Sequence, residues 1–151
     1  MMTRTYPYPR PALTVDVVLI KEGRDGPEIL LIQRNHPPFV GHWALPGGFV
    51  DENEPLEEAA RRELFEETGL EPATLQQLGA FGDPGRDPRG WTVSVVFWTR
   101  IEGEMIPRAG DDAAAARWWP LNALPALAFD HADIVRQAKC HSERAAVEQR
   151  A

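Results

Sequence analysis

The first part of the chain alternates short apolar runs with polar breaks. The runs Leu13–Ile20 and Glu28–Gln33 are rich in Val, Ile and Leu, and each has the length of a single strand. The break between them, Lys21–Pro27, combines glycine with charge, so we expect a β-hairpin. The preceding segment Tyr6–Pro11 contains three prolines and two tyrosines. That composition favours an extended arm over residues 1–12.

The spacing of apolar residues becomes helical after Pro55. Proline suits the first turn of a helix because its missing N–H is not needed there. The pattern predicts a helix to about Thr68, with Asn53 or Glu54 as its cap and Gly69 as its C-terminal stop. Its buried stripe should come from residues at steps of four, which are Leu56, Ala60 and Leu64.

The remaining segments complete an α+β class with a mixed sheet. The expected loops are Asn35–His42, Gly82–Gly90 and Glu102–Ala116. The expected extended segments are Trp43–Leu45, Phe49–Val50, Thr74–Phe81, Trp91–Ile101 and Arg117–Trp119. A last helix should run from about His131 to Glu148 with Asp130 as its cap. We find no internal repeat or linker, so we expect a single domain over residues 1–151.

Composition is that of an ordinary soluble protein, with 43% hydrophobic and 26% charged residues. The net charge is −7, and eight acids but only two bases lie between Asp51 and Glu67. This balance argues against a general nucleic-acid-binding surface, which needs a basic patch. Cys140 is the only cysteine, and we see no signal-peptide or membrane-spanning run. We therefore expect a cytoplasmic protein without a membrane partner.

The acidic segment has the spacing of a metal site. Glu63, Glu66 and Glu67 fall on one helical face, where like charges cost about 0.2–0.5 kcal/mol per pair. A divalent cation would remove that repulsion, and carboxylate oxygens suit Mg²⁺ or Mn²⁺. The alternative is a solvated acidic helix. The four histidines share no spacing, which argues against zinc.

Residues Gly48 to Leu70 resemble the Nudix box, G-x5-E-x7-R-E-U-x-E-E-x-G-U, where U is aliphatic. The matching positions are Gly48, Glu54, Arg62, Glu63, Leu64, Glu66, Glu67, Gly69 and Leu70. The resemblance to Nudix hydrolases implies an α/β/α sandwich with a mixed β-sheet. It also implies Mg²⁺-dependent hydrolysis of a nucleoside diphosphate linked to another group.

The resemblance implies a role for each residue of the box. Glu63 and Glu67 are the first candidates for metal ligands, joined by the carbonyl oxygen of Gly47. Glu66 is either a third ligand or the catalytic base that takes a proton from water. Arg62 would orient a neighbouring carboxylate through a bidentate contact. We interpret Glu54 as structural.

The loop after the box resembles that of the ADP-ribose pyrophosphatases. Pro84 lies fifteen residues beyond Gly69, and the pattern Arg10-Pro11…Val15-Asp16 is also similar to that subgroup. The loop chemistry suggests Arg86 and Arg89 for phosphate and Asp83 or Asp87 for ribose hydroxyls, and the alternative is a Pro/Gly turn in which these Asp and Arg residues pair with one another. The resemblance to Nudix hydrolases implies that Arg34 reaches a substrate phosphate, and the alternative is a surface ion pair. The resemblance also implies a further acid in the loop Glu102–Ala116, which makes Asp111 and Asp112 candidates for a base or an extra ligand, with Glu102 and Glu104 as rivals. Tyr8 or Phe81 could stack on adenine.

The favoured hypothesis is hydrolysis of ADP-ribose to AMP and ribose 5-phosphate. One alternative is a broader Nudix hydrolase of nucleoside triphosphates or dinucleotides. Another is a sensor that binds ADP-ribose without turnover. The intact box and the few residues after Trp119 argue against a sensor that carries a DNA-binding domain. The resemblance also makes the N-terminal arm a candidate for pairing across a homodimer, and a free arm is the alternative.

Overall fold

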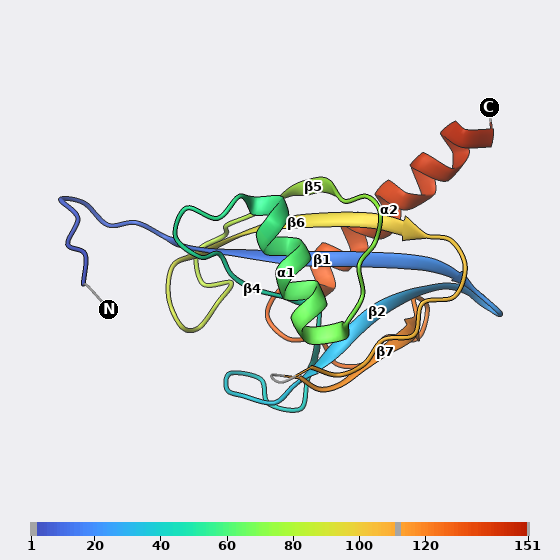
Figure 1. Ribbon diagram of the computed structural model, residues 1–151, viewed down its shortest axis with the longest axis horizontal. Helices are drawn as coiled ribbons and strands as arrows, with labels where there is room; N and C mark the ends of the chain where they lie inside the picture. The colour runs from blue at the N-terminus through green and yellow to red at the C-terminus, as the bar shows by residue number, and fades with distance from the viewer. Residues whose placement is uncertain (1–2, 111–112, 151) are drawn as a thin grey trace.

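A mixed β-sheet lies between two helices in the computed structural model, which describes residues 3–110 and 113–150 (Figure 1). The chain order is β1 Ala12–Gly23, β2 Gly26–Arg34, β3 Trp43–Ala44, β4 Gly47–Phe49, α1 Leu56–Thr68, β5 Gln76–Phe81, β6 Thr92–Ile101, β7 Ala113–Pro120 and α2 His131–Arg150. This arrangement confirms the α+β class and the sandwich with a mixed sheet.

The central strand β1 has different partners along its two halves. It pairs in parallel with β6 over its length, from Ala12 opposite Thr92 to Lys21 opposite Ile101. On its other side it pairs with β4 between Thr14 and Asp16, and with β2 only from Ile20 onward. Further along, β2 pairs with β3 at Ile32 and Gln33, and it pairs with β7 from Glu28 to Arg34. The sheet therefore splits beside the first half of β1.

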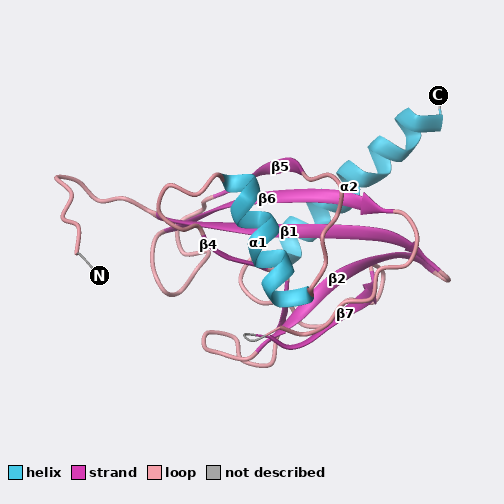
Figure 2. Cartoon of the chain, viewed as in Figure 1, coloured by secondary structure: helices cyan, strands magenta, loops and turns pink. Residues whose placement is uncertain are grey.

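The two helices lie on opposite faces of the sheet (Figure 2), and each is held there by its own hydrophobic cluster. On one face, Ala59, Ala60 and Leu64 of α1 pack with residues of β1, β2 and β6. On the other face, Ile134, Val135 and Ala138 of α2 pack with the alternate residues of the same strands. Burying these side chains supplies the main driving force for folding, roughly 25 cal/mol per Å² of apolar surface.

Helix α1 ends as its sequence predicts but begins differently. Gly69 closes it in the left-handed conformation, with φ of 73°, and its N–H bonds the carbonyl of Phe65. At the other end Pro55 holds the cap position and no side chain caps the helix, so the prediction of Asn53 or Glu54 as caps was wrong. Glu54 instead accepts a hydrogen bond from the N–H of Asp51 and pairs with Arg62.

Other boundaries also differ from the sequence expectations. The β1–β2 hairpin extends to Gly23 opposite Gly26, which shortens the expected turn over Lys21–Pro27 to two residues. Strand β7 begins at Ala113, inside the expected loop, because pairing with β2 extends a run of alanines. Helix α2 reaches Arg150, and the arm before β1 extends away from the body (Figure 1). Neither described helix has the length and apolar composition to cross a bilayer.

Candidate active site

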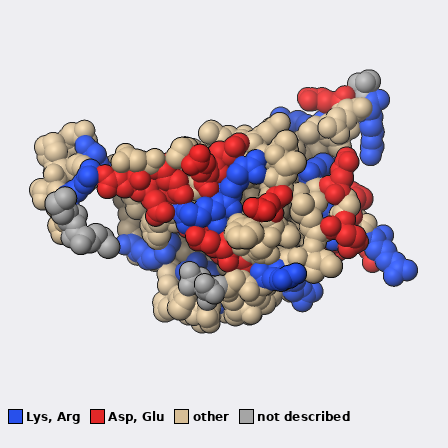
Figure 3. Space-filling model, in the orientation of Figure 1, with Lys and Arg blue, Asp and Glu red and all other residues tan. Residues whose placement is uncertain are grey.

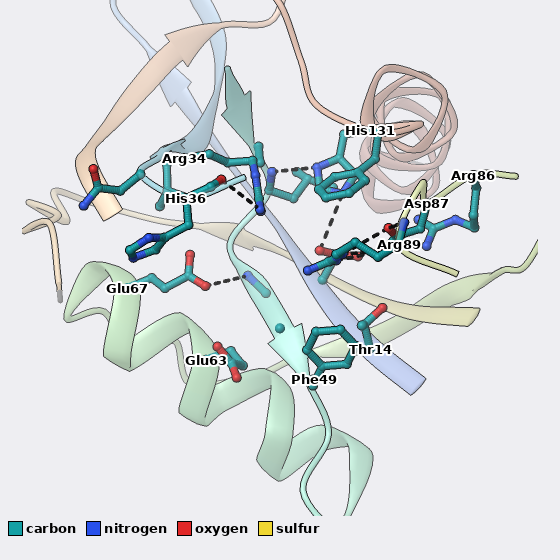
Figure 4. Close-up of a pocket in the computed structure, with 18 of the residues that line it drawn as sticks. Thr14, Arg34, His36, Phe49, Glu63, Glu67, Arg86, Asp87, Arg89 and His131 are labelled. Carbon is teal, nitrogen blue, oxygen red and sulfur yellow. Dashed lines mark hydrogen bonds and ion pairs between the residues drawn. The ribbon is translucent and has the colours of Figure 1, made fainter. Parts of the chain in front are cut away.

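A pocket of about 440 Å³ lies where the sheet splits. Acidic side chains approach it from β1 and α1, and arginines approach it from β2 and from the loop before β6 (Figure 4). The charged and aromatic residues that line it are Asp16, Arg34, His36, Phe49, Asp51, Glu63, Glu67, Arg86, Asp87, Arg89, Phe129 and His131.

Two carboxylates of α1 face the backbone of β4, the short strand that precedes the helix. The N–H of Gly47 lies 3.4 Å from Oε1 of Glu67. A methyl group added at Gly48 would lie 2.5 Å from the carboxyl carbon of Glu63. Strand β4 can approach these carboxylates so closely because neither glycine carries a side chain. Burial raises the pKa of Glu63, and the neighbouring charge of Glu66 acts in the same direction.

Arg62 links the start of the box to the helix. Its Nε and Nη2 donate to both carboxylate oxygens of Glu54, at 2.7 and 2.9 Å. Its Nη1 donates to Glu63 at 2.8 Å, and Nη2 donates to the carbonyl of Phe49. The hydrogen bonds from Arg62 lower the pKa of Glu54 to about 2, with help from the N–H of Asp51. This arrangement gives Arg62 and Glu54 the geometry of positioning groups.

Glu66 occupies a different place from its two neighbours. It does not line the pocket, its side chain is 55% exposed, and it lies 3.3 Å from Nη1 of Arg62. Within residues 3–110 and 113–150, no three acidic, histidine or cysteine side chains are grouped tightly enough to enclose a metal ion. The donor chemistry nevertheless fits a hard cation, because two crowded carboxylates face the pocket beside the Gly47-Gly48 backbone.

The loop between β5 and β6 is fastened to the start of α2. Arg86 donates through Nε and Nη2 to both oxygens of Asp130, at 2.9 and 2.7 Å. Arg89 forms a similar pair with Asp87 of its own loop. Burial raises the pKa of Asp87, but the hydrogen bonds from Arg89 outweigh this and lower it. Both arginines therefore line the pocket already paired with a carboxylate.

Arg34 and Arg89 converge on one aromatic ring. The guanidinium of Arg34 lies 4.9 Å from the centre of Phe129, and that of Arg89 lies 5.3 Å from it. Nε of Arg34 donates to the carbonyl of Pro38 at 2.7 Å. Burial lowers the pKa of Arg34, and the nearby charge of Arg89 lowers it further. An anion bound between these two guanidinium groups would offset their mutual repulsion.

Other candidates lie away from the pocket or outside the described residues. Asp83 does not line the pocket, and its carbonyl accepts the N–H of Arg86. Phe81 packs beside the α2 cluster, and Tyr8 is exposed on the arm, near Arg10. Asp111 and Asp112 lie outside the described residues.

The sequence alone assigned no role to several of the residues that line the pocket. Phe129 and His131 stand on either side of Asp130, where the sequence suggested only a helix cap. Asp16 is a charge within the apolar run of β1, and it had appeared only as part of the Val15-Asp16 pattern, without a role of its own. His131 is buried and its Nδ1 accepts the N–H of Leu45 at 3.0 Å.

Comparison with known proteins agrees with this geometry. The family model of the NUDIX domain matches residues 10–138. An ADP-ribose pyrophosphatase of Methanocaldococcus jannaschii is 47% identical over 85% of this chain and 73% of its own length. An ADPR-responsive transcriptional repressor, NtrR of Acinetobacter baylyi, is 39% identical over 87% of this chain, which spans only 54% of that repressor.

A solved structure shares both the fold and part of the sequence. The Nudix domain of Shewanella oneidensis NrtR, complexed with ADP ribose, superposes with a TM-score of 0.85 and 35% identity. The match covers 91% of this chain and 93% of that domain. The chain therefore belongs to the Nudix family. It is a hydrolase that acts on phosphoanhydride bonds.

Proposed function

We propose that this protein is a Mg²⁺-dependent pyrophosphohydrolase that converts ADP-ribose to AMP and ribose 5-phosphate. The observation that carries the proposal is one pocket with carboxylates on one side and arginines on the other. Such a pocket can hold a cation and a diphosphate together. The Methanocaldococcus jannaschii relative, named an ADP-ribose pyrophosphatase, supports the choice of substrate.

Glu63, Glu67 and the carbonyl oxygen of Gly47 would hold the cation. When bound, Mg²⁺ offsets the charge of the diphosphate and lowers the pKa of a coordinated water. Arg34 and Arg89 bind the phosphate oxygens, and Arg62 keeps Glu63 in position through its bond at 2.8 Å. Glu66, on the same helix one residue before Glu67, would accept the proton released by the attacking water.

A substrate panel tests the activity. ADP-ribose, NADH, diadenosine polyphosphates and nucleoside triphosphates are incubated with Mg²⁺, and the products are separated by chromatography. We expect AMP and ribose 5-phosphate to form faster from ADP-ribose than any product from the others. Chelation should stop the reaction, and added Mg²⁺ should restore it. Preference for a triphosphate or a dinucleotide would contradict the choice of ADP-ribose.

The metal assignment is tested by Glu67→Gln. This change removes one ligand charge at nearly constant volume, so we expect kcat to fall by about a hundredfold or more, with an unchanged circular dichroism spectrum. The matched control is Glu57→Gln on the same helix, where the side chain is 54% exposed. It should retain wild-type turnover. Turnover near the wild-type rate in Glu67→Gln would exclude the assignment.

A second candidate function is ADP-ribose sensing. It is favoured by the likeness to the Acinetobacter repressor and to the ADP-ribose complex of the Shewanella domain. A sensor would bind ADP-ribose tightly in calorimetry and release no AMP in the panel. Turnover of ADP-ribose at an enzyme-like rate would exclude a purely sensing role.

A further inference from the structure

One face of the two central strands changes from polar to apolar along its length. Where α2 covers this face, β1 and β6 contribute Val18, Ile20, Val96 and Trp98 to the core. Earlier on the same face, the positions are Thr14, Asp16, Thr92 and Ser94, all buried. Buried hydroxyl and carboxyl groups cost free energy unless they bond to something. This polar region borders the pocket, because Thr14 and Asp16 both line it.

Asp16 is held by a hydrogen bond from one neighbouring strand, and a histidine from α2 lies beside it. Ser94 of β6 donates its hydroxyl to Oδ2 of Asp16. Nε2 of His131, at the start of α2, lies 3.7 Å from Oδ1. Because Nδ1 of His131 accepts the N–H of Leu45, the proton of the neutral ring sits on Nε2, the nitrogen nearer Asp16. The carboxylate is therefore fixed in orientation, and it retains lone pairs beyond those used by Ser94.

The negative charge of Asp16 restricts which chemical group of a ligand can lie beside it. A carboxylate accepts hydrogen bonds and repels phosphate, whereas Arg34 and Arg89 attract phosphate. The part of the ligand beside Asp16 must then be a neutral donor. The pocket rings Phe49 and Phe129 already carry the guanidinium of Arg89 at 5.0 and 5.3 Å. That contact leaves less room for a stacked base, so a sugar hydroxyl is the better fit.

We propose that Asp16, positioned by Ser94 and flanked by His131, accepts a hydrogen bond from the 2- or 3-hydroxyl of a ribose and thereby selects ribosyl ligands. The inference rests on the proposed function for its ligand class, a nucleoside diphosphate sugar. It does not require turnover. Thr14 lies two residues earlier on the same face of β1 and contributes a second hydroxyl to this subsite.

The test compares ADP-ribose with four analogues, each lacking the 2- or 3-hydroxyl of one of its two riboses. Affinity is measured by calorimetry with EDTA present, so that no ligand is consumed. We expect wild-type protein to bind at least one analogue about 10- to 100-fold more weakly than ADP-ribose, as for a hydrogen bond to a charged acceptor. Asp16→Asn should bind ADP-ribose with a similar loss and should no longer discriminate against that analogue.

Two buried serines provide a test variant and its control. Ser94→Ala removes the hydrogen bond that orients Asp16 and should weaken ADP-ribose binding several-fold. Ser142→Ala removes another buried hydroxyl, bonded to Nε of Arg100 far along α2, and should leave affinity unchanged. If Asp16→Asn folds poorly by circular dichroism, Ser94→Ala and Thr14→Val still test the subsite.

Two results would overturn the inference: wild-type affinity in Asp16→Asn, or undiminished discrimination among the analogues in that variant. Absence of ADP-ribose binding by the wild-type protein would overturn it as well. Failure of the proposed function has a different signature, which is loss of AMP release with discrimination intact. The two proposals can therefore fail separately.

Discussion

At the scale of single residues, Gly47 occupies a position with no room for a side chain. An added methyl group would lie 2.2 Å from the carbonyl oxygen of Val15 and 2.5 Å from Oδ1 of Asp16. The first of these atoms belongs to the backbone of β1, which cannot move without breaking its pairing with β4.

Gly47→Ala should therefore lower the free energy of unfolding by about 1–3 kcal/mol, measured by urea denaturation. The control is Gly79→Ala in β5, where no atom lies within 4 Å of the added methyl group. That variant should be close to wild type. Equal stability of the two variants would contradict the argument.

His131 should make stability depend on pH. Burial lowers its pKa below 6.5, although Asp16 and Asp130 act in the opposite direction. In the unfolded chain the ring takes up a proton below about pH 6.5, while the native ring remains neutral. The unfolded state then binds more protons, so this residue lowers the free energy of unfolding as the pH falls from about 7 to 5.

The measurement is urea denaturation at pH 7.5 and pH 5.5 for wild type and His131→Asn. The asparagine can still accept the N–H of Leu45 but does not titrate. The stability advantage of wild type should shrink at the lower pH. A constant difference between the two proteins would exclude His131 as the source of the pH dependence.

The sequence could identify site residues only where the residues that act together are close to one another along the chain. Glu63 and Glu67 lie one helical turn apart, so their shared face follows from the helix alone, and the structure places both at the pocket. Asp16 and His131 are far apart in sequence and meet only because β1 passes beneath the start of α2. Their pairing depends on tertiary contacts, which no local pattern contains.

At the scale of elements, the ion pair between Arg86 and Asp130 fastens the loop before β6 to α2. The side chain of Arg86 is 5% exposed and that of Asp130 is 20% exposed. Asp130→Ala would leave the Arg86 charge buried without its partner, which costs about 3–5 kcal/mol. The loop that carries Arg89 should also loosen.

We therefore expect Asp130→Ala to lower the free energy of unfolding by that amount and to raise KM for ADP-ribose more than it lowers kcat. The control is Asp133→Ala, which removes an exposed ion pair with Arg136, with side chains 60% and 70% exposed. Exposed pairs of this kind contribute about 0–1 kcal/mol. A comparable loss in both variants would show that the loop is not fastened in this way.

Helices and strands were predictable from the sequence where apolar residues are regularly spaced. They were less predictable where pairing with another strand decides whether a strand forms. The helix at Leu56–Thr68 and the strand at Thr92–Ile101 follow from their patterns. Strand β7 opens with four alanines, which favour a strand only weakly, and it forms because β2 offers an unpaired edge. The split of β1 between β4 and β2 has no local signature at all.

At the scale of the whole molecule, acidic and basic side chains lie interleaved across the face that carries α1 (Figure 3). A ligand that supplies both a cation and a diphosphate should bind the folded chain and not the unfolded one. With Mg²⁺ and ADP-ribose at about a hundred times Kd, binding adds about 2.7 kcal/mol.

That increment should raise Tm by roughly 5–10 °C for a chain of this length. Differential scanning fluorimetry of the wild-type protein checks it, with an ADP-ribose analogue whose two phosphorus atoms are joined by a methylene group, which cannot be hydrolysed. AMP and Mg²⁺ without the second sugar should give a smaller shift. An equal shift with AMP would contradict recognition of the distal ribose phosphate.

Pairing of the N-terminal arm across a homodimer stays a prediction, which light scattering can address.

The two hydrophobic clusters on opposite faces of the sheet have a consequence for how such a protein can diverge. The α1 cluster supports the carboxylates of the box, while the α2 cluster supports His131 and the neighbourhood of Asp16. Both clusters include side chains of β1, β2 and β6, but these side chains lie on opposite faces of the sheet. Mutations can therefore accumulate around α2 and retune ligand choice while the hydrolytic apparatus is inherited unchanged.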